Sequence, residues 1–190
     1  MTKEETGRRA GNIILALGII YLIAAFVLMI NVHIHDNRAA EKSEAVLTKL
    51  EEMIPDESGS GTAGVVSDTL EVIDIEGSSY TGILSIPDKN LSWPVEDRNG
   101  SGKELPACTG GSPYEDTFSI TGPDYKSIFG KLGGLEKGDE VVFTDIYGNL
   151  TKYKVESTGR RVTRNASKAS LTLTAEKMGA AQYAVSCVRE

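Results

Sequence analysis

Residues 138–155 read GDEVVFTDIYGNLTKYKV, a sequence typical of a β-hairpin. The flanks, residues 140–146 and 150–155, are rich in the β-branched and aromatic side chains that favour strands. Residues 147–149, Tyr-Gly-Asn, contain the glycine and asparagine that tight turns prefer. This stretch therefore predicts two antiparallel strands joined by a short turn.

Similar short runs occur on both sides of this hairpin, and two of them, residues 80–86 and 117–121, end at proline or glycine. The further strands that we predict cover residues 80–86, 91–95, 117–121, 170–174 and 182–188. Residues 127–132 are expected to form one helical turn between strands. Many short strands separated by turn residues indicate a mainly β chain, folded as a barrel or a sandwich.

The N-terminal part of the chain has a different character. Residues 13–30, IILALGIIYLIAAFVLMI, are apolar apart from glycine and tyrosine. Roughly 20 such residues in a helix cross the ~30 Å hydrocarbon core of a bilayer. A cleaved signal peptide would be shorter and would end in a small-residue cleavage site, whereas Asn31 and Val32 follow here. We therefore expect an uncleaved transmembrane anchor over residues 12–32.

The flanking charges predict the orientation of this anchor. Lys3, Arg8 and Arg9 precede it, and the first charged residue after it is Asp36. Positive charge tends to stay on the cytoplasmic side. Residues 1–11 are thus expected to form a cytoplasmic tail, and the C-terminal domain to lie outside the cell membrane.

Three segments are expected to follow the anchor. Residues 33–54 predict a membrane-proximal amphipathic helix, capped by Asp36 or Asn37 and ended by Pro55. We interpret this helix as a plain spacer, with docking on the following domain as the alternative. Residues 55–68 have the small, polar composition of a flexible linker, and residues 69–190 form the β domain.

The charge of the chain argues against one class of partner. The formal net charge is −7, with 27 acidic and 20 basic side chains. Nucleic-acid binding needs lysine and arginine gathered on one surface. We therefore expect no nucleic-acid partner.

The order of the predicted strands resembles the catalytic domain of sortases. The segments that carry the resemblance are YTGILSIPDKNLSWPV from residue 80, TFSITGPDYKSIFGKL from residue 117, the hairpin above, and LTLTAEKMGAAQYAVSCVRE from residue 171. The likeness is closest to class B sortases. It implies a sortase-like eight-stranded β-barrel with short helices, an N-terminal anchor and a place on the outer face of a Gram-positive membrane.

The resemblance also implies a chemistry. Sortases cleave a Leu-Pro-x-Thr-Gly-like sorting signal with a cysteine nucleophile, a histidine and an arginine. The position of the histidine corresponds to Pro123, that of the cysteine to Glu176 (or to Ala175 if the register shifts by one), and that of the arginine to Gln182. The resemblance therefore implies that all three catalytic residues are substituted. The resulting candidates for a ligand groove are Gly122, Pro123, Asp124, Tyr125, Thr174, Ala175, Glu176 and Gln182.

Reactive residues elsewhere do not replace this set. The chain has only two histidines, His33 and His35, both beside the anchor, and an i, i+2 pair does not share a helix face, so we expect no metal site. Cys108 and Cys187 could pair outside the cell, which the sequence alone does not decide. The remaining candidate cations are Arg160, Arg161, Arg164 and Arg189.

Three hypotheses of function follow from these substitutions. The first is an inactive pseudosortase that binds a sorting-signal peptide, a pilin or an active sortase at the cell surface, without a cofactor. The alternative is a divergent active transpeptidase that uses a serine, a threonine or Cys108, with lysine as the only available base. The third is a structural module. Glu176 either accepts a hydrogen bond from a ligand, with Asp124 as a possible partner, or faces water without a role.

Overall fold

The computed structural model describes residues 3–54, 70–97, 99–100, 103–160, 169–177 and 180–190. These residues belong to two compact units, 1–37 and 38–190. The predicted linker, residues 55–68, and two of the candidate cations, Arg161 and Arg164, lie outside the described residues.

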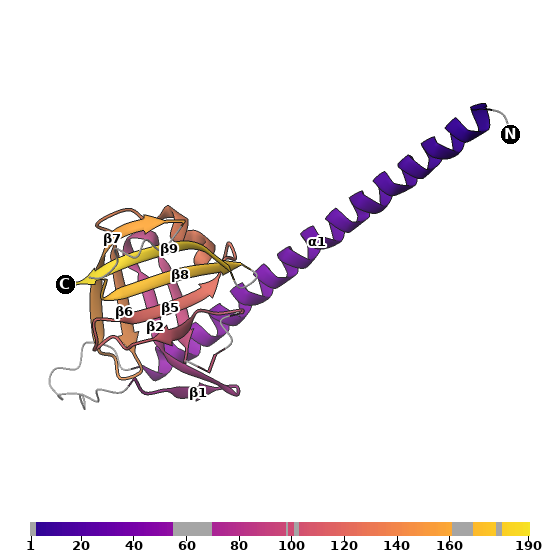
Figure 1. Cartoon of the computed structure of the whole chain (residues 1–190). Helices are drawn as coiled ribbons and strands as arrows, with labels where there is room; N and C mark the ends of the chain where they lie inside the picture. Colours follow the sequence, from indigo (N-terminus) through magenta and orange to yellow (C-terminus); the bar gives the residue numbers. More distant parts are fainter. Residues whose placement is uncertain (1–2, 55–69, 98, 101–102, 161–168, 178–179) are drawn as a thin grey trace. The chain divides into compact units, whose positions relative to one another are not determined.

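A single helix, α1 (Lys3–Met53), carries the predicted anchor and continues beyond it (Figure 1). The helix contains an apolar stretch of 18 residues with a mean hydropathy of 2.6, and none of the side chains in this stretch is buried. A core helix of a soluble protein would bury such side chains, so the exposure agrees with a membrane span. The anchor and the membrane-proximal helix were expected as separate segments, and the structure joins them without a break.

Within the second unit, the described residues from 70 to 190 form a closed β-barrel with short 3-10 helices. Its strands are β2 (Ser78–Ile86), β3 (Leu91–Glu96), β4 (Ala107–Gly110), β5 (Phe118–Pro123), β6 (Glu140–Asp145), β7 (Leu150–Gly159), β8 (Leu171–Lys177) and β9 (Ala180–Arg189). A ninth strand, β1 (Ile73–Ile75), pairs with the start of β2. The 3-10 helices are η1 (Pro87–Lys89) and η2 (Phe129–Gly134).

The barrel runs in the order β2-β3-β4-β5-β8-β9-β7-β6, and β6 returns to β2. Closure removes the exposed strand edges of an open sheet. At the closing pair, Gly82 faces Asp145 with its φ angle at +153°. A β-carbon at this position would lie 2.1 Å from the carbonyl oxygen of Thr144, so the two strands meet closely because residue 82 has no side chain.

The predicted hairpin is confirmed as β6 and β7, and a buried carboxylate holds its turn. Asp145, which is 2% exposed, accepts hydrogen bonds from the backbone amides of Tyr147 and Asn149 at 2.8 and 2.9 Å. The Asn149 side chain and the Tyr114 hydroxyl donate to the same carboxylate. Aspartate commonly organises turns in this way, because its side chain reaches backbone amides two to four residues ahead.

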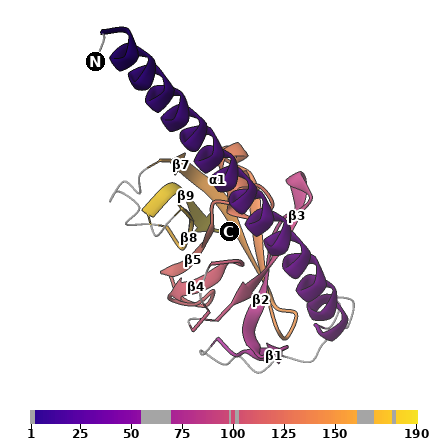
Figure 2. The same ribbon diagram turned by 90° about the vertical axis from the view of Figure 1, so that its right-hand side faces the viewer.

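The helix segment after the apolar stretch packs on the barrel, so our interpretation of it as a plain spacer was wrong. Ala39, Val46 and Leu50 are at most 4% exposed and belong to the hydrophobic core. They recur at helical spacing and thus lie on one face of α1. Figure 2 shows this part of α1 running alongside β2 and β3. Lys42 adds a polar contact, since its ammonium lies 3.3 Å from Glu96 and 3.5 Å from Glu104.

Candidate functional site

The parallel pairing of β5 and β8 brings the predicted site residues together. Gly122 pairs with Ala175, Pro123 pairs with Glu176, and the amide of Asp124 donates a 2.7 Å hydrogen bond to the carbonyl of Glu176. These strands lie side by side in Figure 1. Residues far apart in the sequence thus meet at one end of the barrel.

Gln182 reaches the same end through β9. Glu176 pairs with Ala181 and Ala175 pairs with Tyr183, so Gln182 is the extra residue of a β-bulge. Neighbouring strands lie about 4.8 Å apart, which places Pro123, Glu176 and Gln182 within roughly 10 Å across the sheet. A bulge changes the direction of its side chain, and bulges often occur beside functional sites. The side chain of Gln182 is exposed.

The burial pattern of β8 distinguishes the two residues that the sequence offers for the nucleophile position. Leu171, Leu173 and Ala175 are fully buried in the barrel, whereas Thr174 and Glu176 are partly exposed. Successive side chains of a strand point to opposite faces. Glu176 therefore lies on the outer face, where a ligand could reach it, and Ala175 belongs to the core.

Pro123 and Tyr125 have structural roles around this end of the sheet. β5 ends at Pro123, as expected of a residue without a backbone donor. The carbonyl of Tyr125 then accepts hydrogen bonds from the amides of Ile128 and Gly130, which turns the chain into η2. Behind the sheet, a β-carbon on Gly122 would lie 2.9 Å from the ring of Phe129, so this glycine allows η2 to pack closely.

Small hydroxyl side chains cover the outer surface beside these positions. Two cross-strand pairs of hydroxyl residues join β5 and β8: Ser119 pairs with Thr172, and Thr121 pairs with Thr174. The hydroxyls of Thr109 and Thr121 lie 3.2 Å apart. We call this surface the hydroxyl face; its residues, all of them half-buried or exposed, are Thr109, Ser119, Thr121, Thr172 and Thr174. Both donors and acceptors are available there, as an extended polar ligand would require.

Sequence reasoning missed most of the hydroxyl face, although a signal for it exists. Phe118 to Thr121 and Leu171 to Thr174 both alternate apolar and hydroxyl residues, so each predicts hydroxyls on one face of a strand. That the two strands are neighbours is a feature of the tertiary structure. Thr109 was missed because we predicted no strand in the Gly- and Pro-rich segment around it, whereas the structure forms β4 there.

Neither cysteine lies on the hydroxyl face. Cys108 and Cys187 are both buried, and both are free thiols, so they do not form a disulfide. Cys187 is fully buried, and its backbone pairs with Leu171 and Val155. Burial raises the pKa of the Cys187 thiol to about 12. A thiol in this environment is protonated at neutral pH and is a poor nucleophile.

Neither histidine belongs to the unit that contains the barrel, and of the two described candidate cations only Arg160 lies near the end of the barrel that carries the site. His33 and His35 belong to the first compact unit, where His33 contacts Asn37 at 3.4 Å. Arg160 is exposed. Arg189 lies seven residues beyond Gln182 on β9, roughly 23 Å along the strand. Its guanidinium donates to the carbonyls of Pro113 and Glu115 and so holds the loop before β5.

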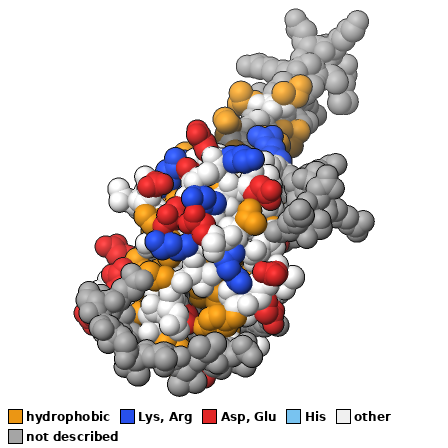
Figure 3. Space-filling view, turned by 90° about the vertical axis from the view of Figure 1, so that its left-hand side faces the viewer, with side chains coloured by type: hydrophobic (Ala, Val, Ile, Leu, Met, Phe, Trp, Pro, Cys, Tyr) orange, Lys and Arg blue, Asp and Glu red, His pale blue; other side chains and the backbone are white. Residues whose placement is uncertain are grey.

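The described surface gives no sign of a metal centre or of a single-sign charged patch on the face in Figure 3. Within the described residues, no group of three or more histidine, cysteine or acidic side chains could hold a metal ion. Figure 3 shows lysine and arginine mixed with aspartate and glutamate on the visible face. Mixed charges of this kind are typical of an ordinary solvated protein surface.

Comparisons with known proteins agree with the fold. No family model and no curated protein matches the chain. Among solved structures, sortase C1 from Streptococcus agalactiae is similar at 17% identity and a TM-score of 0.50, covering 81% of this chain and 86% of that chain. Sortase A from Corynebacterium diphtheriae is similar at 15% identity and a TM-score of 0.49, covering 82% and 84%. The likeness to sortase C1 shows that the barrel is sortase-like in fold, and the predicted closeness to class B stays a prediction.

The buried Cys187 thiol predicts how stability depends on pH. Burial holds this thiol protonated up to a pKa of about 12, whereas an unperturbed thiol has a pKa of 9.0. Above pH 9 the unfolded chain therefore binds fewer protons than the folded one, and stability falls as the pH rises toward 12. We expect the thiol to contribute a slope of about 1.4 kcal/mol per pH unit in this window.

The dependence of the free energy of unfolding on pH is measured by urea unfolding between pH 8 and pH 11. Cys187→Ala is expected to make this dependence less steep. Val185→Ala is the matched control, since Val185 is equally buried on the same strand and its loss leaves the thiol in place. Equal slopes in the two variants would contradict the assignment. Tyr153, whose pKa burial raises to about 12, adds a contribution that both variants keep.

Proposed function

We propose that this chain is a membrane-anchored, sortase-like protein that binds an extended peptide without cleaving it. The observation that carries the proposal is the strand pairing that gathers Pro123, Glu176 and Gln182 at one end of the barrel. By resemblance to sortases, these positions would hold the imidazole, the thiol and the guanidinium of a transpeptidase. A proline, a carboxylate and an amide cannot supply a nucleophile, a proton shuttle and an oxyanion donor together.

The hydroxyl face supports peptide binding. An extended peptide presents alternating backbone donors and acceptors, and a surface of threonine and serine hydroxyls can satisfy both. Glu176, which is partly exposed at the end of this surface, can accept a strong hydrogen bond from an amide or an amine of the ligand. The class of ligand that we propose is a sorting-signal-like segment, either free, on a pilin or presented with an active sortase. The domain would face the outside of the membrane, as the charges around the anchor predict.

The alternative, an active transpeptidase with displaced residues, is not favoured. Cys108 and Cys187 are buried in the barrel rather than placed on the hydroxyl face. A serine or threonine nucleophile would need an adjacent base. Both histidines lie in the first compact unit, residues 1–37, and so do not belong to the barrel.

The proposal is tested by titrating isotope-labelled full-length protein in detergent micelles with sorting-signal peptides and scrambled controls. We expect shifts of the amide signals of Thr174, Glu176 and Gln182, with no new peptide species. Thr174→Val removes one hydroxyl without changing the shape of the side chain and should weaken binding roughly fivefold. Thr151→Val, on β7, is the matched control and should bind normally.

Two outcomes would contradict the proposal. A cleaved peptide that appears only with the protein would show that catalysis persists. No shift with any sorting-signal peptide would remove peptide binding and favour a scaffold that recognises whole proteins. The full chain is required, because a fragment that begins at residue 65 would lose Val46 and Leu50 from its core.

Restoring the three reactive side chains is not expected to restore activity. We predict that the triple variant Pro123→His, Glu176→Cys and Gln182→Arg shows no transpeptidation above background. Catalytic groups must be held to within about half an ångström of their working positions. Residue 182 lies in a β-bulge, and without a reaction to support, its side chain has had no reason to keep pointing toward an oxyanion. The assay follows transfer of a sorting-signal peptide to an amine. Robust transfer would show that only the reactive groups had been lost.

A further inference from the structure

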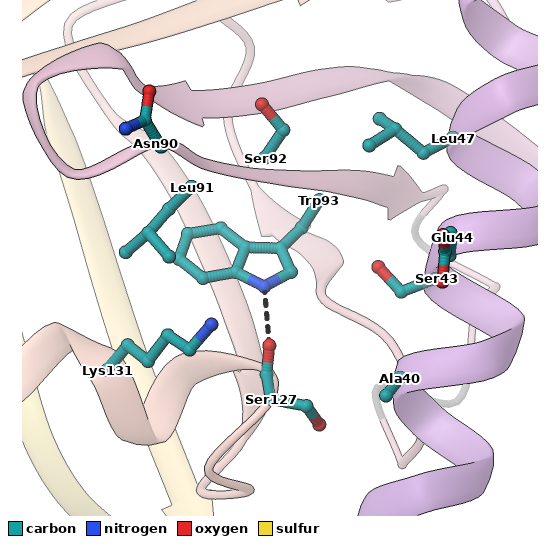
Figure 4. Close-up of a pocket in the computed structure, with 10 residues that line it drawn as sticks. All are labelled: Ala40, Ser43, Glu44, Leu47, Asn90, Leu91, Ser92, Trp93, Ser127 and Lys131. Atoms are coloured by element: carbon teal, nitrogen blue, oxygen red, sulfur yellow. Dashed lines mark hydrogen bonds between the residues drawn. The ribbon is translucent and has the colours of Figure 1, made fainter.

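A cavity lies where the docked part of α1 meets β3 and η2 (Figure 4). Its volume is about 240 Å³. Pockets for drug-sized ligands are roughly 300–1,000 Å³, so this cavity suits a smaller molecule. All of its lining residues belong to the compact unit 38–190, and none of them belongs to the hydroxyl face.

The apolar part of the lining is contributed by two elements. Leu47 comes from α1, and Leu91 and Trp93 come from β3. Figure 4 shows Leu47 pointing from the helix toward this strand and Leu91 lying beside the indole. The indole is fixed by a 3.0 Å hydrogen bond from Nε1 to the carbonyl of Ser127 and by an edge-on contact with Phe129. Leu47 and Leu91 are half-buried and offer apolar surface to a short hydrocarbon group, and the indole of Trp93, which is 2% exposed, forms a nearly buried part of the same lining.

Two opposite charges line the same cavity. Glu44 comes from α1 and Lys131 from η2, and Figure 4 shows the lysine extending toward the indole. Within the described part of the chain, neither side chain forms an ion pair. The two groups therefore remain available for a ligand that carries both complementary charges.

We propose that this cavity binds a small zwitterion with an apolar body, the chemistry of an apolar α-amino acid. The carboxylate of the ligand would accept hydrogen bonds from the Lys131 ammonium, and its ammonium would donate to Glu44. The side chain would rest on Leu47, Leu91 and Trp93. Such a ligand satisfies both charges of the site and buries apolar surface, which neither a simple anion nor a simple hydrocarbon does. The site is separate from the peptide-binding surface, so either can exist without the other.

Binding in the cavity can be followed by tryptophan fluorescence, because Trp93 lines the cavity and is the single tryptophan of the chain. Full-length protein in detergent micelles is titrated with L-leucine while tryptophan emission is recorded. We expect a saturable change in emission. Leucinamide lacks the carboxylate and N-acetylleucine lacks the ammonium, and each should bind at least fivefold more weakly than leucine.

Matched variants test the named residues. Lys131→Met and Glu44→Gln should each weaken leucine binding roughly fivefold. Their controls are Lys137→Met and Glu51→Gln, which replace exposed side chains that do not line the cavity and should bind normally. Ala40→Leu should abolish binding, because the larger side chain fills the cavity from the helix side.

Three results would overturn the proposal. One is the absence of a saturable change with leucine while the folded protein retains its emission spectrum. Another is equal affinity for leucine, leucinamide and N-acetylleucine, which would show that the charges are not used. The third is equal weakening in the cavity variants and in their controls. None of these results would bear on peptide binding at the hydroxyl face.

Discussion

Replacing Leu50 by alanine is expected to lower the free energy of unfolding of the barrel by about 3 kcal/mol. Leu50 is fully buried, although it lies on the helix that continues from the candidate membrane span. Its loss removes apolar contacts and leaves a cavity between the helix and the barrel. A helix that served only as a spacer would show no such effect.

The experiment is urea unfolding of full-length protein, followed by the emission of Trp93, which is 2% exposed and packed on Phe129. Met53→Ala is the matched control, since Met53 lies on the same helix and is 54% exposed. We expect its effect to stay within about 0.5 kcal/mol. Similar small changes in both variants would mean that the helix does not dock on the barrel in solution.

Replacing Gly82 by alanine is expected to lower the free energy of unfolding at least as much as Leu50→Ala does. The new β-carbon would lie 2.1 Å from the carbonyl oxygen of Thr144, and the backbone carbonyl cannot move without breaking the pairing of β2 with β6. The φ angle of +153° adds backbone strain for any residue with a side chain. Together these effects should cost about 3 kcal/mol or more, enough to open the barrel.

Gly133→Ala provides the control for this prediction. No atom lies within 4 Å of a β-carbon built at Gly133. Its effect should therefore be close to zero or slightly stabilising, because alanine restricts the unfolded chain. The two variants are compared by unfolding and by the dispersion of their amide spectra. A well-folded Gly82→Ala variant of normal stability would show that β2 and β6 are not this close.

Local patterns in the sequence were sufficient for several elements. The hairpin of β6 and β7 was predictable because its turn residues and its strand-forming residues are neighbours in the chain. The end of β5 was predictable because a proline lacks a donor wherever it occurs. The apolar N-terminal helix follows from composition over a continuous stretch.

Two strands were missed for the opposite reason. β1 has three residues and β4 has four, and β4 meets β3 through a single parallel pair at Glu96 and Ala107. Such short segments carry too few residues for a periodic pattern. They are strands because neighbouring strands supply hydrogen-bond partners, and that information is not local.

Some features of the candidate site were likewise predictable from the sequence, and others were not. The residue types at Pro123, Glu176 and Gln182 are read directly from the sequence, and so is the small hydroxyl character of the strands beside them. That Pro123 lies opposite Glu176, that Ala175 faces the core, and that Gln182 occupies a bulge depend on register. Register follows from how the whole barrel packs its alternating side chains, so no single segment determines it.

The sequence by itself thus determined the residues that are present, the β class of the domain and the apolar helix, because periodicity and composition act over neighbouring residues. Only the tertiary structure decided that the helix docks, that the two cysteines remain free and buried, and that Glu44 and Lys131 line one cavity. Each of these depends on contacts between segments tens of residues apart, and such contacts form only when the barrel closes.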